Sequence, residues 1–243
     1  TYVFQRGTNR GDSWIAPPTW AGDSAGTWRG DRTSFVIRVD GGSIVNDPSI
    51  PNGDGRLYRG LMIRKTRVSL TNSGLVTFEK HVLGDNHPFV MNGPTRQHRD
   101  SYLYDNGSEI SIGGMDNPTR IMSTEWDMIF AQEAVELTEE DADNLSTRLR
   151  NGRAPIQQLG MDTNPGAPMH WLKQRCDKER ARMIFCRHED NPILYDHEKQ
   201  EWTARGVEYL AKLDALTGAR KERLRFGKWT QAEDVIYDNW TQD

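Results

Sequence analysis

A short, continuously apolar run that ends in polar residues constrains the fold of this chain most strongly. The run is Met128–Ala131, and Gln132 and Glu133 follow it directly. A strand that is apolar on both faces is typical of the interior of a parallel sheet. A second apolar run, Ile156–Met161, leads into the polar turn Asp162–Pro165. Ligands bind beyond the carboxyl ends of parallel strands, so the two polar ends mark a candidate site.

Strand and helix signals alternate from Leu57 onward, which indicates a parallel sheet covered by helices. Thr138 and Asp141 form a capping box that opens a helix ending near Asn151. Ser69 is expected to cap another helix that continues to Val82 and stops at Gly84. The remaining expected strands are Leu61–Ile63, Ser101–Tyr104, Ser108–Ile112 and Met183–Cys186, and the remaining helices are Pro168–Arg182, Ala204–Leu216 and Arg220–Phe226. An Asn-Gly turn at residues 106–107 predicts that two of these strands form a hairpin.

Residues 1–58 differ from the rest of the chain. They hold nine of the 22 glycines, and only Ser34–Val39 reads as a strand. A loop region of this length is uncommon in a compact domain. The segment is therefore divergent, poorly ordered or translated in a shifted reading frame, and the sequence leaves these three interpretations open.

Composition limits the class of protein. With 35% hydrophobic and 27% charged residues, the chain has the composition of a globular protein. No apolar run approaches the roughly 20 residues that span a bilayer, so no membrane partner is expected. The two cysteines, Cys176 and Cys186, match neither zinc spacing nor a disulfide framework.

Glu133 is the strongest catalytic candidate, because in ATP-driven motors a glutamate at a strand's carboxyl end polarises the attacking water. Gln132 occupies the position where such enzymes often have a magnesium-binding aspartate, and it is also explained as a polar strand end. Arg120 is a candidate arginine finger toward a neighbouring subunit, or a solvated loop arginine. Arg64 and Lys65, after the strand Leu61–Ile63, face either phosphate or solvent.

Two further stretches admit a functional and a structural interpretation. Histidines and carboxylates alternate over His188–Glu198, which would suit a metal-dependent nuclease or another DNA-binding module, although loop hydrogen bonding also explains them. The basic stretch Arg220–Arg225 either contacts DNA phosphates or forms a solvated helix face.

As an ordered set, segments over residues 57–240 resemble the ATPase domain of the large terminase subunit, the DNA-packaging motor of tailed bacteriophages. The matching stretches are Ile63–Arg67, Ser69–Ser73, Asp105–Ser108, Ile112–Gly114, Ser123–Glu133, Leu145–Arg150, Asp162–Pro165, His170–Leu172, Asp190–Pro192, Tyr209–Leu213, Leu216–Gly218, Arg223–Arg225 and Gly227–Trp229. The resemblance implies a P-loop NTPase-like α/β fold whose parallel sheet is flanked by helices, with a small helical lid subdomain.

The resemblance also implies residue roles. It makes Met128–Glu133 the Walker B motif, with Glu133 as the catalytic carboxylate. Thr163, Asn164 and Pro165 would form the coupling motif that links hydrolysis to DNA movement. ATP and Mg²⁺ are the implied cofactors. The implied partners are double-stranded DNA, the portal protein, the small terminase subunit and further copies of the chain in a ring on the procapsid, in the host cytoplasm.

The implied domain organisation has three parts. Residues 1–58 form an atypical N-terminal segment, residues 59–190 the ATPase core, and residues 191–243 the lid and the start of a linker to a nuclease domain. That nuclease domain is expected to be missing, since the chain ends at about the point where it would start.

One departure from the family pattern is clear. No G-x-x-x-x-G-K-[ST] phosphate loop occurs in the 243 residues, although the resemblance places one between about residues 10 and 50. Gly41 and Gly42 offer glycines but have no lysine behind them. The alternative function is therefore a truncated or frame-disrupted terminase fragment that neither binds nor hydrolyses ATP.

Overall fold

The computed structural model describes residues 2–6, 57–104, 107–154 and 157–231. The chain divides into two compact units, which are described separately: Phe4–Asp162, and Thr163–Asp243 together with Thr1–Val3. Strand β1 (Tyr2–Arg6) crosses the division between them. The strand expected at Ser34–Val39 lies outside the described residues, and the domain boundary predicted between residues 190 and 191 stays a prediction.

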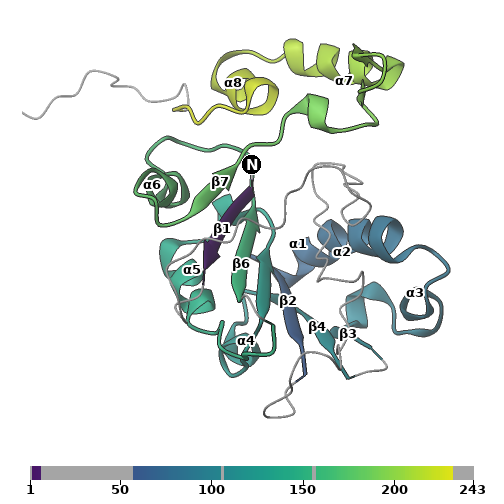
Figure 1. Ribbon diagram of the computed structural model, residues 1–243, viewed down its shortest axis with the longest axis vertical. Coiled ribbons are helices and arrows are strands. Elements are labelled where there is room, and N and C mark those ends of the chain that lie inside the picture. Colours follow the sequence, from purple (N-terminus) through teal and green to yellow (C-terminus); the bar gives the residue numbers. More distant parts are fainter. Residues whose placement is uncertain (1, 7–56, 105–106, 155–156, 232–243) are drawn as a thin grey trace, which may run out of the picture. The chain divides into compact units, whose positions relative to one another are not determined.

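The first unit is built on a mostly parallel sheet with helices beside it (Figure 1). Its strands follow the order β3-β4-β2-β5-β6, in which β4, β2, β5 and β6 run parallel and β3 pairs antiparallel with β4. Their bounds are β2 Arg59–Arg64, β3 Ser101–Leu103, β4 Glu109–Gly114, β5 Met128–Ala131 and β6 Gln158–Asp162. This architecture confirms the α/β class that the alternating pattern predicts.

The interior strand β5 is buried on both faces. Ile129 and Ala131 are fully buried, and Phe130, whose side chain points to the opposite face, is 4% exposed. The continuous apolar run from Met128 therefore marks an interior strand correctly. The hairpin is also confirmed, because β3 and β4 pair antiparallel, and Gly107 has a positive φ of 81°, which glycine adopts readily.

Helices α1 (Arg67–Asn72) and α2 (Gly74–Thr77), with the π-helix η1 (Phe78–Leu83), cover one face of the sheet. Their apolar side chains meet those of the sheet in one core, formed by Met62, Leu70, Leu75, Phe78, Tyr102, Ile110 and Ile112. The sequence predicts one helix capped by Ser69, and this is wrong in two respects. Thr66 is the cap, since its hydroxyl accepts the Ser69 N–H at 3.1 Å, and the helix breaks at Ser73. It ends at Gly84 as predicted, where φ is 89°.

On the opposite face, α4 (Thr119–Met122) packs closely on the sheet. A Cβ added at Gly113 would lie 2.5 Å from Ile121 Cδ1, so a larger residue there would require the Ile121 side chain to shift. Helix α5 (Glu139–Ser146) begins with the predicted capping box, in which the Thr138 hydroxyl accepts the Asp141 N–H. It ends at Ser146 and not near Asn151, because Leu149 already pairs with Trp126 in a β-bridge.

Short elements complete the first unit. These are α3 Pro88–Asn92, the 3-10 helix η2 Arg96–His98 and the 3-10 helix η3 Ala134–Glu136. No helix in the described part of the chain is both long and apolar enough to cross a bilayer.

The second unit contains α6 (Trp171–Asp177), β7 (Arg182–Ile184), the 3-10 helix η4 (His188–Asp190), the small antiparallel pair β8 (Tyr195–Asp196) and β9 (Glu201–Trp202), α7 (Ala204–Asp214) and α8 (Gly218–Phe226). The two C-terminal helices agree with the sequence prediction, whereas α6 is shorter than predicted. His170 caps α6 through Nδ1, and Glu179 ends it by adopting a φ of 57°.

Candidate functional site

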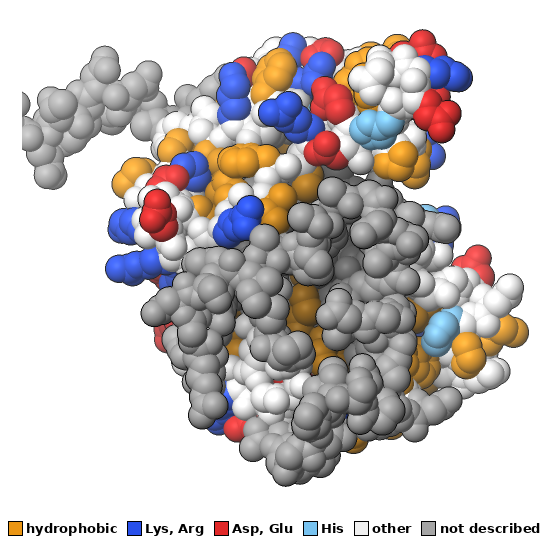
Figure 2. All heavy atoms as spheres, in the orientation of Figure 1, with side chains coloured by type: hydrophobic (Ala, Val, Ile, Leu, Met, Phe, Trp, Pro, Cys, Tyr) orange, Lys and Arg blue, Asp and Glu red, His pale blue; other side chains and the backbone are white. Residues whose placement is uncertain are grey.

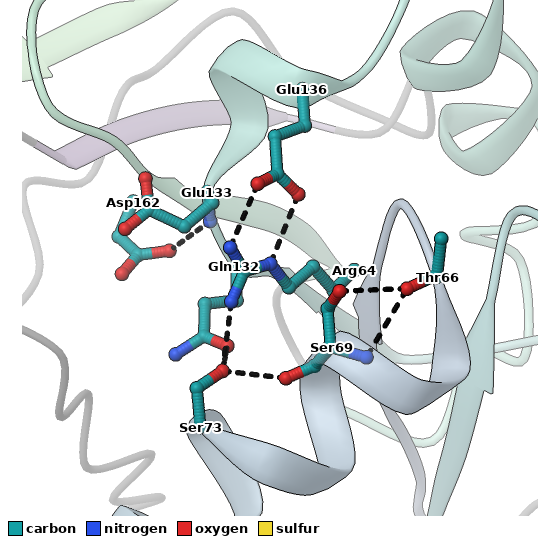
Figure 3. Close-up of polar contacts among 8 residues, drawn as sticks. All are labelled: Arg64, Thr66, Ser69, Ser73, Gln132, Glu133, Glu136 and Asp162. Carbon is teal, nitrogen blue, oxygen red and sulfur yellow. Dashed lines mark hydrogen bonds and ion pairs between the residues drawn. The ribbon is translucent and has the colours of Figure 1, made fainter.

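The carboxyl ends of β2, β5 and β6 bring several predicted site residues together. The parallel register pairs Ile63 with Ala131, and Ala131 with Met161. Arg64, Gln132 and Asp162 therefore follow at the same edge of the sheet, and Glu133 comes one residue later (Figure 3). Parallel pairing thus assembles a polar cluster from segments far apart in the sequence.

Arg64 contacts two other residues of this cluster, Glu136 and Ser73. Its Nε and Nη2 donate to the two carboxylate oxygens of Glu136 at 3.0 and 2.7 Å, and its Nη1 donates to Ser73 Oγ at 2.8 Å. Such a bidentate pair fixes geometry as well as contributing energy. The hydrogen bond from Arg64 holds the pKa of the Glu136 carboxyl below its usual range, and Glu136 in turn raises the Arg64 pKa. Arg64 therefore ties the end of β2 to the turn that follows Glu133.

Gln132 is enclosed beside α2. Its backbone N–H donates to Ile63 O at 2.7 Å, and its side chain is only 2% exposed. Ser73 Oγ lies 3.1 Å from Gln132 Oε1. A Cβ added at Gly74 would lie 2.6 Å from the same oxygen, so a larger residue at the start of α2 would require the Gln132 amide to shift.

Glu133 lies immediately beyond the sheet and caps η3. Its φ of 51° and ψ of 55° are left-handed. Its backbone N–H donates to Asp162 Oδ1 at 2.9 Å, and its carbonyl accepts the Glu136 N–H at 2.9 Å. The side chain is partly exposed, as a group that acts on a ligand requires.

Asp162 is buried at the end of β6, where it is 4% exposed. Burial raises the pKa of its carboxyl to about 7, and the neighbouring Glu133 charge acts in the same direction. Strongly raised carboxyl pKa values are concentrated at functional sites. This edge of the sheet therefore carries a partly exposed carboxyl group, that of Glu133, next to a buried one, that of Asp162.

Lys65 is directed to the helix α5. Its Nζ forms an ion pair with Asp141 Oδ2 at 2.8 Å, and the same oxygen accepts the Thr138 N–H in the capping box. Although burial opposes it, hydrogen bonding from Lys65 and Thr138 keeps the pKa of the Asp141 carboxyl below its usual range. Lys65 thus connects the end of β2 with the start of α5.

Arg120 is not brought into this cluster. It lies on α4, is largely exposed, and its Nη1 is 3.6 Å from the exposed Asp100 carboxylate. An exposed ion pair of this length contributes little to stability. The role of Arg120 as a finger toward a neighbouring subunit stays a prediction.

The predicted coupling residues directly follow Asp162 and belong to the second unit. Thr163 is buried and its hydroxyl donates to Asn164 O at 2.9 Å. Asn164 is exposed and Pro165 is buried. Their proposed role in linking hydrolysis to movement also stays a prediction.

In the His188–Glu198 stretch, described carboxylates bond to the loop itself. Asp190 accepts the Arg187 N–H at 2.6 Å, and Asp196 accepts the Glu198 N–H at 3.0 Å. Among the described residues, no group of three or more His, Cys, Asp or Glu side chains lies close enough to hold a metal ion.

Charges of both signs mix over α7 and α8 in the second unit (Figure 2). Lys221 and Arg225 both approach Asp214, at 3.9 and 3.0 Å, and Lys228 pairs with Glu222 at 2.7 Å. The basic stretch Arg220–Arg225 therefore has acidic partners on its own surface.

Sequence reasoning missed the roles of three residues in the polar cluster: Ser73, Glu136 and Asp162. In the sequence, Asp162 stands out only as the start of a polar turn. No local sequence pattern could have revealed the hydrogen bond between Asp162 and Glu133, because the two residues are 29 positions apart.

The mixed α/β architecture, with its mostly parallel sheet flanked by helices, matches that of large terminase structures. Two crystal structures of the large terminase from a thermophilic bacteriophage match this chain with TM-scores of 0.55 and 0.54, and they are 17% and 18% identical to it. The second is a complex with ADP. Each match covers 76% of this chain and 44% of the solved chain, so the chain spans less than half the length of these terminases.

The chain belongs to the phage terminase large subunit family, whose model matches residues 59–209. This confirms the family resemblance found in the ordered motifs. No curated protein sequence matches the chain.

Proposed function

We propose that this chain is the ATPase motor domain of a phage large terminase, which couples ATP hydrolysis to translocation of double-stranded DNA into a procapsid. The observation that carries the proposal is Glu133 at the carboxyl end of the interior strand β5, beside the ends of β2 and β6. Membership of the terminase large subunit family supports it, and so does the thermophilic-phage terminase that is described in complex with ADP.

Glu133 would orient the attacking water and accept its proton. Gln132 would hydrogen-bond a water on Mg²⁺, and Arg64 and Lys65 would face the nucleotide phosphates once released from their carboxylate partners. Arg120 of one subunit would stabilise charge in the site of its neighbour.

ATP would supply the phosphoanhydride bond whose hydrolysis drives the motor. The described residues fit this cofactor only in part: Glu133 would supply the water-activating carboxylate, whereas the sequence contains no phosphate loop with its lysine and Ser/Thr. The described residues by themselves therefore do not complete a nucleotide site.

The remaining assignments follow from the family. Thr163, Asn164 and Pro165 would couple hydrolysis to DNA movement. Residues 59–190 would form the ATPase core, and residues 191–243 the lid and the start of a linker. Double-stranded DNA, the portal protein, the small terminase subunit and further copies of the chain would be its partners in the host cytoplasm.

Substitution of the catalytic carboxylate tests the proposal. Glu133→Gln should abolish DNA-stimulated ATP turnover, because general-base catalysis contributes about 10²–10⁴-fold. Glu140→Gln, on the exposed first turn of α5, is the matched control and should turn over ATP at the wild-type rate. Equal turnover by wild type and Glu133→Gln would remove the assignment.

A specific observation favours a second candidate, a terminase fragment without ATP binding. The missing phosphate loop is that observation. Calorimetric titration of the chain with Mg-ATP distinguishes the two, since micromolar binding excludes the inert fragment. Reading the encoding DNA in its other two frames over the first 58 codons would reveal a displaced G-x-x-x-x-G-K-[ST], if one exists.

A further inference from the structure

The backbone of Glu133 adopts a conformation that needs support from elsewhere. Among the described non-glycine residues, only Glu133, Glu179 and Gln200 have positive φ values. For a residue with a side chain, the left-handed region costs about 1–2 kcal/mol. The Gln132 N–H donates the last hydrogen bond from this segment to β2, to Ile63 O at 2.7 Å. The chain turns away from the sheet at the next residue, Glu133.

The support at this turn comes from the neighbouring strand β6. Asp162 is the last residue of β6, and its Oδ1 accepts the Glu133 N–H at 2.9 Å. The register pairs Ala131 with Met161, so Asp162 stands opposite Gln132 and needs to reach only one residue further. Burying a carboxyl group is costly unless it is hydrogen-bonded. The hydrogen bond from the Glu133 N–H therefore offsets part of the cost of burying the Asp162 carboxyl group.

Charged groups at the ends of β5 and β2 act on Asp162. The Glu133 carboxylate, at the end of β5, raises the pKa of the Asp162 carboxyl in addition to the larger effect of burial. The Arg64 guanidinium, at the end of β2, interacts favourably with both carboxylates. Asp162 is thus part of the electrostatic environment of Glu133 as well as of its backbone geometry.

We propose that Asp162 is a positioning residue that holds the Glu133 backbone in its left-handed turn and thereby aims the Glu133 carboxylate. The proposal rests on the function proposed for Glu133. The direction of a Cα–Cβ bond follows from the backbone dihedrals, so release of the turn would redirect the carboxylate. Misplacement of a reacting group by about 1 Å can cost about 10²-fold in rate.

Two matched variants of the full chain test the proposal by NMR. Asp162→Asn keeps an oxygen acceptor for the Glu133 N–H, whereas Asp162→Leu removes it with little change in shape. In the Leu variant, the Glu133 amide should exchange with solvent roughly tenfold faster or more, and its ¹³C shifts should leave the left-handed range. The Asn variant should retain the wild-type shifts. Glu179, whose φ of 57° does not involve Asp162, is the internal control.

Unchanged exchange and ¹³C shifts of Glu133 in a folded Asp162→Leu variant would overturn the proposal. If that variant does not fold, the Asn variant decides. Its Glu133 amide exchange and ¹³C shifts should match those of the wild type, because the side-chain oxygen still accepts the Glu133 N–H. Glu133 ¹³C shifts outside the left-handed range in Asp162→Asn would equally overturn the proposal.

Turnover separates this proposal from the function on which it rests. If wild type hydrolyses ATP, Asp162→Leu should lower kcat at least roughly tenfold and leave KM unchanged, since a general loss of structure would change both. If wild type does not hydrolyse ATP but the Glu133 signals change in the Leu variant, the catalytic assignment fails and the positioning role of Asp162 stands.

Discussion

Replacing Asp127 with alanine should destabilise the first unit strongly. The Asp127 carboxylate is fully buried at the amino end of β5. Its Oδ2 accepts the Arg59 N–H at 3.0 Å and the Asn151 Nδ2–H at 2.6 Å. Its Oδ1 accepts the N–H groups of Arg153 and Ala154 at 2.8 and 2.9 Å. Through these bonds, one side chain connects β2, β5 and the segment that precedes β6.

The expected loss follows from these bonds. A hydrogen bond to a charged group contributes about 1.5–3 kcal/mol, and a buried donor left without an acceptor costs about 1–3 kcal/mol. The four bonds share one acceptor group, so their contributions do not add fully. We expect Asp127→Ala to lower the free energy of unfolding by about 4 kcal/mol, a large part of the roughly 5–15 kcal/mol typical of a domain. Asp127→Asn should cost about 3 kcal/mol, because its NH₂ group would face N–H donors.

Hydrogen exchange of peptides covering β2 and β5 measures this loss within the first unit alone. A loss of about 4 kcal/mol corresponds to roughly a thousandfold lower protection. Asp85→Ala is the control, because Asp85 is exposed and a surface substitution should change stability by less than about 0.5 kcal/mol. If Asp127→Ala and Asp85→Ala give the same protection, the reasoning from buried donors is refuted.

Three further predictions concern the polar cluster and the helix beside it. Thr138→Ala removes the cap that accepts the Asp141 N–H, so the α5 amides should lose about 1 kcal/mol of protection in hydrogen exchange. Arg64→Lys loses the two-pronged contact with the partly exposed Glu136, and a double-mutant cycle with Glu136→Gln in urea should give a coupling of about 1 kcal/mol. The raised pKa of the Asp162 carboxyl stabilises the fold below about pH 4 by about 4 kcal/mol, and this contribution is lost as the pH rises through about 7. The free energy of unfolding of Asp162→Asn should therefore vary less with pH in this range than that of the wild type.

Each of these predictions has a contradicting result. Wild-type exchange of the α5 amides in Thr138→Ala would show that the cap does not stabilise the helix. Additive effects in the Arg64 and Glu136 cycle would show that the pair is not coupled. Parallel stability curves for wild type and Asp162→Asn between about pH 4 and 7 would contradict the raised carboxyl pKa.

The sequence by itself determined the elements whose signals lie within a few residues. The apolar run Met128–Ala131 predicted an interior parallel strand, and the spacing of Thr138 and Asp141 predicted a capping box. Both are present, because side-chain burial in a strand and capping in a helix depend on adjacent or near-adjacent positions. Helix ends were less accurate. The Thr66 cap and the break at Ser73 depend on hydrogen bonds that compete with the helix pattern around Ser69.

Only the tertiary structure decided which polar groups meet. Glu133 could be chosen as the catalytic candidate from its place after an apolar run. No local sequence signal predicted the left-handed backbone of Glu133 or its hydrogen bond to Asp162. The same holds for the ion pair between Arg64 and Glu136. These contacts join residues 29 and 72 positions apart, and they exist because β2, β5 and β6 lie side by side in parallel register. A sequence pattern specifies each strand, whereas strand order and register specify which strand ends share an edge.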